Sequence, residues 1–158
     1  MPHVSAGIHP RLANHWRMST VTQAHVVASL RQLGLGPGDL VMVHSSLSSF
    51  GQVEGGAETV IQALLETLGP EGTLVMPTLC QKEKERRFET WDIRTSPSDV
   101  GKITEVFRTW PGAARSDHAT HSVAALGPLA ERITAGHATA GGRPGPWGPA
   151  AFAAGSPW

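Results

Sequence analysis

The sequence predicts an α/β fold, because two short strand-like runs flank a segment with helical periodicity. The first run is 39–45 (DLVMVHS) and the second is 73–76 (TLVM), and both are short, apolar and rich in branched side chains. Between them, apolar residues recur at helical spacing from Ala57 to Leu68, and Gly69-Pro70 closes the helix. A strand, a loop, a helix and a second strand in this order are typical of a right-handed βαβ unit with parallel strands.

Further elements are expected on both sides of this unit. Ser19 or Thr20 is a candidate N-cap for a first helix, which the glycines and proline of 34–38 end. Ser96-Pro97-Ser98-Asp99 has the residues of a helix start, with cap candidates, a proline in the first turn and an acid near the positive end of the dipole. The remaining expectations are a helix over 21–33, a charged surface loop over 81–87, a helix face from Val100 to Trp110, a strand over 122–126 and a short helix over 128–135.

The length and the charge of the chain limit the kind of protein. A chain of 158 residues suffices for one domain, and we expect residues 1–17 to be a flexible extension and 18–158 to belong to a single domain. Thirteen basic and thirteen acidic residues cancel, so nucleic acid is not an expected partner. No apolar stretch approaches the ~20 residues of a membrane span, and the N-terminus lacks the apolar middle section of a secretory signal. With one cysteine, Cys80, an intrachain disulfide is excluded and a cytoplasmic protein is the expectation.

The segment from His44 to Gly56 is the first candidate site. It lies between a predicted strand and a predicted helix, and it is rich in serine and glycine. Backbone N–H groups, serine hydroxyls and the unpaired N–H groups of a helix start can together hold a phosphate or diphosphate without a formal cation. The pattern is neither a Walker loop nor a G-x-G-x-x-G fingerprint. On the residues alone, an anion cradle and a plain structural turn both stay open.

The segment 117–122 (DHATHS) is the second candidate site. His118 and His121 beside Asp117 could be two metal ligands, with His44 or His137 as a third. They could equally be a base and its orienting partner, or a polar turn. Cys80 has no histidine near it in sequence and is interpreted as a small packing residue.

Several motifs in a fixed order resemble one known family. Residues 41–78 (VMVHSSLSSFGQVEGGAETVIQALLETLGPEGTLVMPT) resemble the signature region of the aminoglycoside 3-N-acetyltransferase family. The resemblance runs from about Ser19 to Trp158. The later segments that resemble its following motifs are 95–101 (TSPSDVG), 107–112 (FRTWPG) and 115–127 (RSDHATHSVAALG).

The resemblance implies a fold, a reaction and a set of coenzyme contacts. The fold would be a three-layer α/β/α sandwich around a central mixed sheet, distinct from that of the GNAT acetyltransferases. The reaction would be direct transfer of acetyl from acetyl-CoA to an amine of an aminoglycoside, without a covalent enzyme intermediate and without a metal. Matched by position, the implied coenzyme-binding residues are Ser46, Leu47, Ser48, Gly51, Val53, Arg115, Ser116, His118 and Ser122. Arg115 would suit a phosphate through its forked donors, and Ser122 would suit the thioester end.

The sequence departs from the family pattern in two ways. His118-Ala119 stands where the family has His-Pro, and Val123 stands where it has Phe after the serine. The family's catalytic histidine and its acid lie in a motif beyond the Ser-Pro-Trp at which this sequence ends, so an N-terminal portion is expected and no catalytic base is named. Exposed sheet edges in such a portion would favour a homo-oligomer.

Two alternatives to the acetyltransferase function stay open, and so does the identity of the amine substrate. A catalytically silent CoA-binding module is the first alternative, and a metal-dependent hydrolase built on His118 and His121 is the second. The run 81–87 is basic on balance, whereas polycationic aminoglycosides favour an acidic cleft. Glu89, Asp92 and Asp99 could supply carboxylates, and other amines stay open as substrates.

Overall fold

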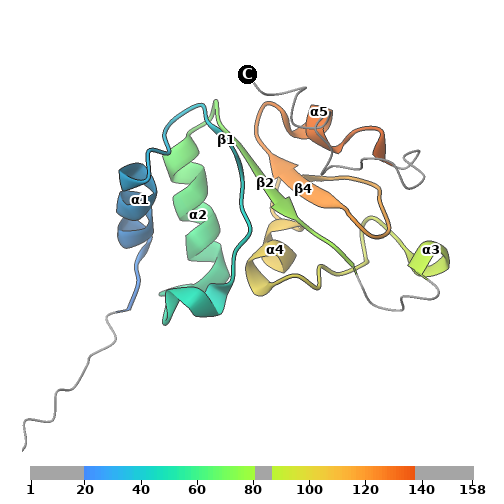
Figure 1. Cartoon of the computed structure of the whole chain (residues 1–158), viewed down its shortest axis with the longest axis horizontal. Coiled ribbons are helices and arrows are strands. Elements are labelled where there is room, and N and C mark those ends of the chain that lie inside the picture. The colour runs from blue at the N-terminus through green and yellow to red at the C-terminus, as the bar shows by residue number, and fades with distance from the viewer. Residues whose placement is uncertain (1–19, 81–86, 138–158) are drawn as a thin grey trace, which may run out of the picture.

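The computed structural model describes residues 20–80 and 87–137 and has the predicted α/β class, with a mixed four-stranded sheet (Figure 1). The expected extension 1–17 and most of the charged run 81–87 lie outside the described residues. The helices are α1 (Gln23–Gln32), the 3-10 turn η1 (Leu47–Phe50), α2 (Gly56–Leu68), α3 (Arg87–Thr90), α4 (Lys102–Phe107) and α5 (Ala130–Thr134). The strands are β1 (Leu40–Met42), β2 (Thr73–Pro77), β3 (Ala114–Arg115) and β4 (Val123–Leu126).

The sheet has the order β1-β2-β4-β3. β1 and β2 are parallel, as the βαβ pattern predicts, with Val41 opposite Leu74. β4 runs antiparallel to both of its neighbours, and Pro77 of β2 lies opposite Val123. The C-terminal ends of β1 and β2 and the N-terminal end of β4 therefore meet at one end of the sheet.

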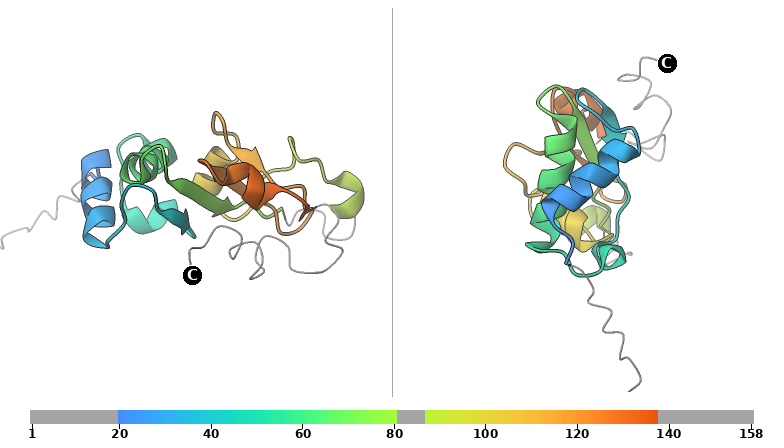
Figure 2. Two further views of the ribbon diagram at one scale, coloured as in Figure 1. Left: turned by 90° about the horizontal axis from the view of Figure 1, so that it is seen from above. Right: turned by 90° about the vertical axis from the view of Figure 1, so that its left-hand side faces the viewer.

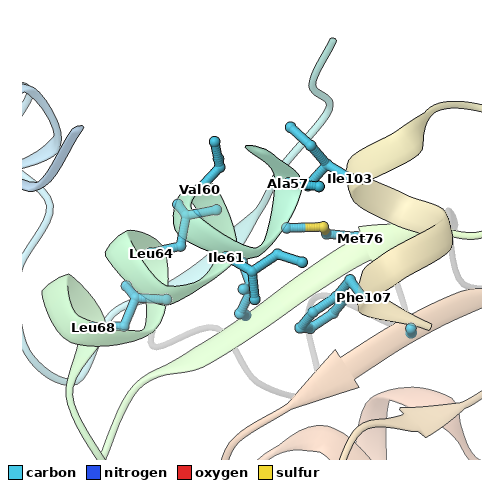
Figure 3. Packing of buried hydrophobic residues seen from close by; sticks show 10 residues of the cluster. Ala57, Val60, Ile61, Leu64, Leu68, Met76, Ile103 and Phe107 are labelled. Atoms are coloured by element: carbon cyan, nitrogen blue, oxygen red, sulfur yellow. The ribbon is translucent and has the colours of Figure 1, made fainter. Parts of the chain in front are cut away.

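The two faces of the sheet bury different side chains, because successive residues of a strand point to opposite sides. Leu74 and Met76 of β2 and Ala124 of β4 pack with α2 and α4 (Figure 3). Val75, Val123 and Ala125 form a second cluster with Ala130 and Ile133 of α5. β2 lies inside the sheet and is buried at every position. This burial on both faces explains why its sequence is an almost continuous apolar run.

The first helix lies at one end of the molecule, beside α2 (Figures 1 and 2). Val26 and Val27 of α1 pack against Ala63 of α2. Thr22 caps α1 by accepting a hydrogen bond from the backbone N–H of His25, and the side chain of His25 accepts one from the N–H of Thr22 in return. Among the described helices, none is long and apolar enough to cross a membrane.

The helix start expected at Ser96-Pro97-Ser98-Asp99 is wrong. α4 begins only at Lys102, because Gly101 at its N-terminus has a φ of 145° that breaks the helical path. The cap-like residues serve other bonds: the N–H of Ser98 donates to the Glu105 carboxylate at 2.6 Å, and the N–H of Asp99 donates to the carbonyl of Leu79 at 2.9 Å.

Candidate functional site

Three loops meet at the end of the sheet where β1 and β2 finish and β4 begins. The backbone N–H of Val43 still donates to the carbonyl of Val75, so the loop after β1 leaves the sheet only at His44. The N–H of Thr78 donates to the carbonyl of Ser122, which ties the end of β2 to the loop before β4. Gly101 reaches the same end, since a Cβ added there would lie 3.4 Å from the carbonyl oxygen of Ser45.

The loop after β1 turns sharply around its serines. Ser46 precedes η1, and its Oγ lies 2.9 Å from the Oγ of Ser48. The N–H groups of Ser49 and Gly51 donate to the carbonyls of Ser46 and Ser48. Gly51 has a φ of 74°, a conformation that glycine adopts without strain. The hydroxyls of Ser46 and Ser48 thus form an exposed pair at the end of β1.

Two backbone hydrogen bonds join the second half of this loop to the segment before α1. The N–H of Val21 donates to the carbonyl of Gln52, and the N–H of Glu54 donates to the carbonyl of Val21. Val53 is the bridge residue opposite Val21. Gly55 is left-handed with a φ of 71°, and no side chain caps the first N–H groups of α2. Those groups suit an anion, although Glu58 already supplies a carboxylate in the first turn.

An apolar cavity of about 540 Å³ lies beside the loop, between α1 and β1. Its wall includes Val26, Leu30, Val41 and Phe50, and the start of the loop at His44 and Ser45 closes one side. The Oγ of Ser45 is enclosed and has no hydrogen-bond partner among the described residues. Leu47 is half-buried and packs against the core cluster of α2, β2 and α4, so it anchors η1.

Arg115 opens the segment 115–122, which contains the second candidate site, and every N–H donor of its guanidinium is engaged. Its Nε donates to Thr78 Oγ1 at 3.2 Å, and one terminal nitrogen donates to the Thr78 carbonyl at 2.8 Å and to Ser122 Oγ at 3.3 Å. The other terminal nitrogen donates to the carbonyls of Ile93 at 3.1 Å and Ser96 at 2.5 Å. A guanidinium has five N–H donors, so none is left over for a phosphate in this arrangement.

The surroundings of Arg115 are unusual for a cation. Its guanidinium carbon lies 4.7 Å from the centroid of the Trp91 ring, and the Trp91 N–H donates to the Asp117 carboxylate at 2.6 Å. Burial, and secondarily the charge of Arg108, lowers the pKa of Arg115 to about 10. The group stays charged near neutral pH, and carbonyl dipoles in place of a carboxylate stabilise it.

Ser116 and Ser122 are both fully buried and both bonded within the protein. Ser116 Oγ accepts a hydrogen bond from the N–H of Val123 at 2.9 Å. Ser122 Oγ donates to the Thr78 carbonyl at 2.7 Å and lies 3.1 Å from Thr78 Oγ1. These hydroxyls hold the start of β4 against β3 and β2. A hydrogen bond donated by Ser122 to the coenzyme would require its O–H to leave the Thr78 carbonyl.

His118 lies in the turn between β3 and β4, half-buried. Its Nδ1 lies 3.2 Å from the backbone N of Thr120 and 3.0 Å from the backbone N of His121. Burial, with a smaller contribution from His121, lowers its pKa below the usual 6.5. The rings of His118 and His121 are 5.6 Å apart and nearly perpendicular.

A carboxylate–guanidinium pair next to this segment escaped the sequence interpretation. Arg108 donates to both oxygens of Glu105, at 2.6 and 2.7 Å, and to the carbonyl of Arg94 at 3.0 Å. The pair lowers the pKa of Glu105 and raises that of Arg108. The spacing of three residues on α4 was a signal that could have found it.

The metal interpretation of the histidines finds no support in residues 20–80 and 87–137, where no three His, Cys, Asp or Glu side chains cluster closely enough to hold an ion. Cys80 is buried, with 8% of its surface exposed, which agrees with a packing residue.

Comparison with known proteins decides the family. The sequence profile described as Aminoglycoside 3-N-acetyltransferase matches residues 42–155, which is more than half of the chain. The chain belongs to the aminoglycoside 3-N-acetyltransferase family. The expected resemblance is thereby confirmed. Both candidate segments, 44–56 and 115–122, lie within the matched residues.

Similar proteins include an aminoglycoside N(3)-acetyltransferase III of Salmonella sp, 38% identical over 143 residues, or 78% of this chain and 50% of that protein. The solved structure of AAC-IIIb as a binary complex with CoASH has 35% identity and a TM-score of 0.66, covering 75% of this chain and 50% of that one. Sisomicin-bound AAC-VIa has 30% identity and a TM-score of 0.70, covering 75% and 51%. The chain thus spans about half the length of the curated relatives that it matches.

Proposed function

We propose that this chain contributes the coenzyme-holding part of an enzyme that transfers acetyl from acetyl-CoA to an amino group of an aminoglycoside-type substrate. The observation that carries the proposal is the loop 46–53, where an exposed pair of serine hydroxyls and an uncapped helix start adjoin the end of a parallel strand. Similarity to an enzyme whose structure holds CoASH, and to one bound to sisomicin, supports the coenzyme and the substrate class.

The proposed reaction is a direct transfer. The amine nitrogen attacks the thioester carbonyl, a C–N bond forms, the C–S bond breaks, and free CoA thiol leaves while a base takes the ammonium proton. No residue of this chain is assigned as that base. A silent CoA-binding module stays the alternative, and it differs in one observable: it would bind CoA without releasing thiol.

The proposed contacts are those implied by position. Ser46, Ser48, Gly51 and Val53 belong to one loop, and Leu47 anchors it. The second segment, from Arg115 to Ser122, enters the proposal differently. Arg115, Ser116 and Ser122 hold this segment against the end of β2 and the start of β4, and His118 is the member with a ring nitrogen that no described residue engages. We further propose that the complete fold is a three-layer α/β/α sandwich distinct from GNAT, which the packing of helices on both faces of the sheet supports.

Calorimetry with CoA tests the binding proposal. Replacing Ser46 and Ser48 together by alanine should weaken CoA binding by roughly 1–3 kcal/mol, because a hydrogen bond to a charged group contributes about 1.5–3 kcal/mol. Ser49→Ala, an exposed serine of the same turn, is the matched control and should bind like the wild type. Wild-type protein without saturable CoA binding would overturn the proposal. Equal affinity of the double variant would mean that backbone groups alone hold the coenzyme.

An acetyl-transfer assay separates enzyme from module. Thiol release from acetyl-CoA is followed with sisomicin or gentamicin as the acceptor. Release that depends on the acceptor supports the enzyme, and tight CoA binding without any release supports the module.

A further inference from the structure

The cavity between α1 and β1 leaves apolar surface uncovered at the edge of the sheet. Its volume is about 540 Å³, and its wall comes from α1, from β1 and from α2. α1 packs on α2 through Val26 and Val27, and it stands beyond α2 on the side of the molecule away from β4 (Figures 1 and 2). Leu33 follows α1, lines the cavity and is 78% exposed, which no other large apolar side chain among the described residues approaches.

β1 has one free edge. It is the outermost strand on its side of the described sheet, next to β2. The N–H of Val43 donates to the carbonyl of Val75, so the backbone groups of Val43 face β2. The backbone groups of alternate residues point to opposite sides of a strand, so those of Leu40 and Met42 face away from β2, where no described strand pairs with them. Such an edge is a template for a further strand.

The side chains of β1 show how a further strand would fit. Val41 and Val43 pack with the cluster of α2 and α4, whereas Leu40 and Met42 pack with the cluster under α5. A strand added about 4.8 Å from β1 would continue both faces, and its side chains on the side of α1 would enter the cavity. The enclosed Oγ of Ser45 lines this cavity and has no partner among the described residues, although a buried hydroxyl normally has one. The added strand would supply that partner.

We propose that the cavity and the free edge of β1 together bind one apolar β-strand from the other half of a family-length protein. The length of the chain carries this choice of occupant. The chain spans about half of the curated relatives that it matches, so each of them contains about as much sequence again. The bound strand would be apolar on both faces, as strands inside a sheet are. The inference rests on membership of the family and does not depend on CoA binding.

A second copy of this chain fits the same edge less well. It would bring its own α2 over its own β1, since Val41 and Val43 pack with the cluster of α2. α1 of the first copy already borders that place, across the cavity from β1. The two helices would compete for one position, so we expect the other half of the protein to displace a self-associated copy.

Hydrogen exchange in the presence of the other half tests the proposal. The probe is the half of the Salmonella sp aminoglycoside N(3)-acetyltransferase III that this chain does not match, expressed as a separate polypeptide. We expect it to slow amide exchange of Met42 by about 10-fold or more, because a free edge group becomes a ladder group. The amide of Val43, already bonded to Val75, is the internal control and should change less. Overlapping peptides from the same half are a second probe that needs no folding.

A proline variant tests the strand pairing. Met42→Pro removes an N–H that β2 does not use, and proline is tolerated on edge strands. It should bind the other half about 10-fold more weakly than Met42→Ala, which loses the side chain and keeps the N–H. Equal binding of the two variants would contradict pairing at this edge.

A charge at the rim tests the part played by the cavity. Leu33→Lys should weaken binding of the other half, and the wild-type urea midpoint should be kept because Leu33 is exposed. Gln32→Lys adds the same charge at the neighbouring exposed position, which does not line the cavity, and should bind like the wild type. Equal binding of the two lysine variants would overturn the role of the cavity.

Two results would overturn the proposed occupant. In the first, neither the other half nor any of its peptides slows exchange at Met42. In the second, sedimentation shows a homodimer that the other half does not dissociate. CoA is absent from all of these measurements, so their failure is distinct from a failure of the proposed function.

Discussion

Arg115 joins three parts of the chain that are distant in sequence. Its side chain, at the edge of the sheet, reaches the end of β2 at Thr78, the segment 93–96 and the start of β4 at Ser122. A buried cation bonded to several backbone oxygens fixes the shape of a loop as well as its stability.

Arg115→Met tests this role through stability. The methionine keeps much of the apolar stem but leaves buried acceptors without their donor, so we expect a loss of about 3 kcal/mol in the free energy of unfolding. Urea denaturation followed by circular dichroism measures it. Arg132→Met, at an exposed position of α5, is the control and should change stability by less than about 0.5 kcal/mol. If the two variants lose the same amount, Arg115 is not the structural centre of this segment.

At the scale of elements, one glycine allows the end of β4 to approach the start of β2. A Cβ added at Gly127, which follows β4 with a φ of 127°, would collide with the carbonyl oxygen of Gly72 and lie 2.8 Å from the Cα of Thr73. These are backbone atoms of the residues that start β2, and they cannot move aside without displacing the strand.

Gly127→Ala should therefore destabilise the protein by more than about 2 kcal/mol, because both the collision and the positive φ oppose the side chain. Gly36→Ala is a matched control, since nothing lies within 4 Å of its added Cβ and its φ is ordinary. Thermal unfolding of the two variants compares them. A Gly127→Ala protein that melts with the control would contradict the close approach of the two strands.

The elements that the sequence predicts best are those with long or continuous apolar patterns. Helical spacing from Ala57 to Leu68 locates α2 within one residue of its start, and the buried run TLVM locates β2. β3 escaped prediction because two residues carry no period, and η1 because its bonds are set by Ser46 and Gly51 rather than by an apolar face. The predicted start of α4 was wrong because serine and aspartate are common in turns as well as at helix N-caps. The backbone of Gly101, with its positive φ, keeps 96–99 outside the helix, which begins after it.

At the scale of the whole molecule, the sequence could locate the candidate site but not the contacts between its side chains. Family motifs indicated the two segments 44–56 and 115–122, and the strand pattern predicted that one of them follows a parallel strand. Nothing in the spacing shows that Arg115 bonds to Thr78, which lies 37 residues away, or that Trp91 covers it. Such contacts depend on the order of strands, which local pattern does not contain. Within the described sheet β1 is an edge strand, and a homo-oligomer through that edge stays a prediction.

The pH dependence of folding is a property of the whole chain. Burial lowers the pKa of both His118 and His137 in the folded state below the usual 6.5. As pH falls, the unfolded chain takes up protons at these histidines first, so protonation favours unfolding. We expect the free energy of unfolding to be highest above about pH 7 and to decrease as pH falls through 6.5 toward the folded pKa values.

Two carboxylates, Asp92 and Glu105, have lowered pKa values and titrate below this window. Hydrogen bonds to backbone and hydroxyl groups lower the pKa of Asp92, and Arg108 lowers that of Glu105, so their contributions are lost only in more acidic solution. Urea titrations at pH 7.5, 6.5 and 5.5 measure the slope. The double variant His118→Asn/His137→Gln should have a flatter slope than the wild type over this range. An unchanged slope would mean that other groups cause the acid sensitivity, and that the buried imidazoles take up protons as readily in the folded chain as in the unfolded one.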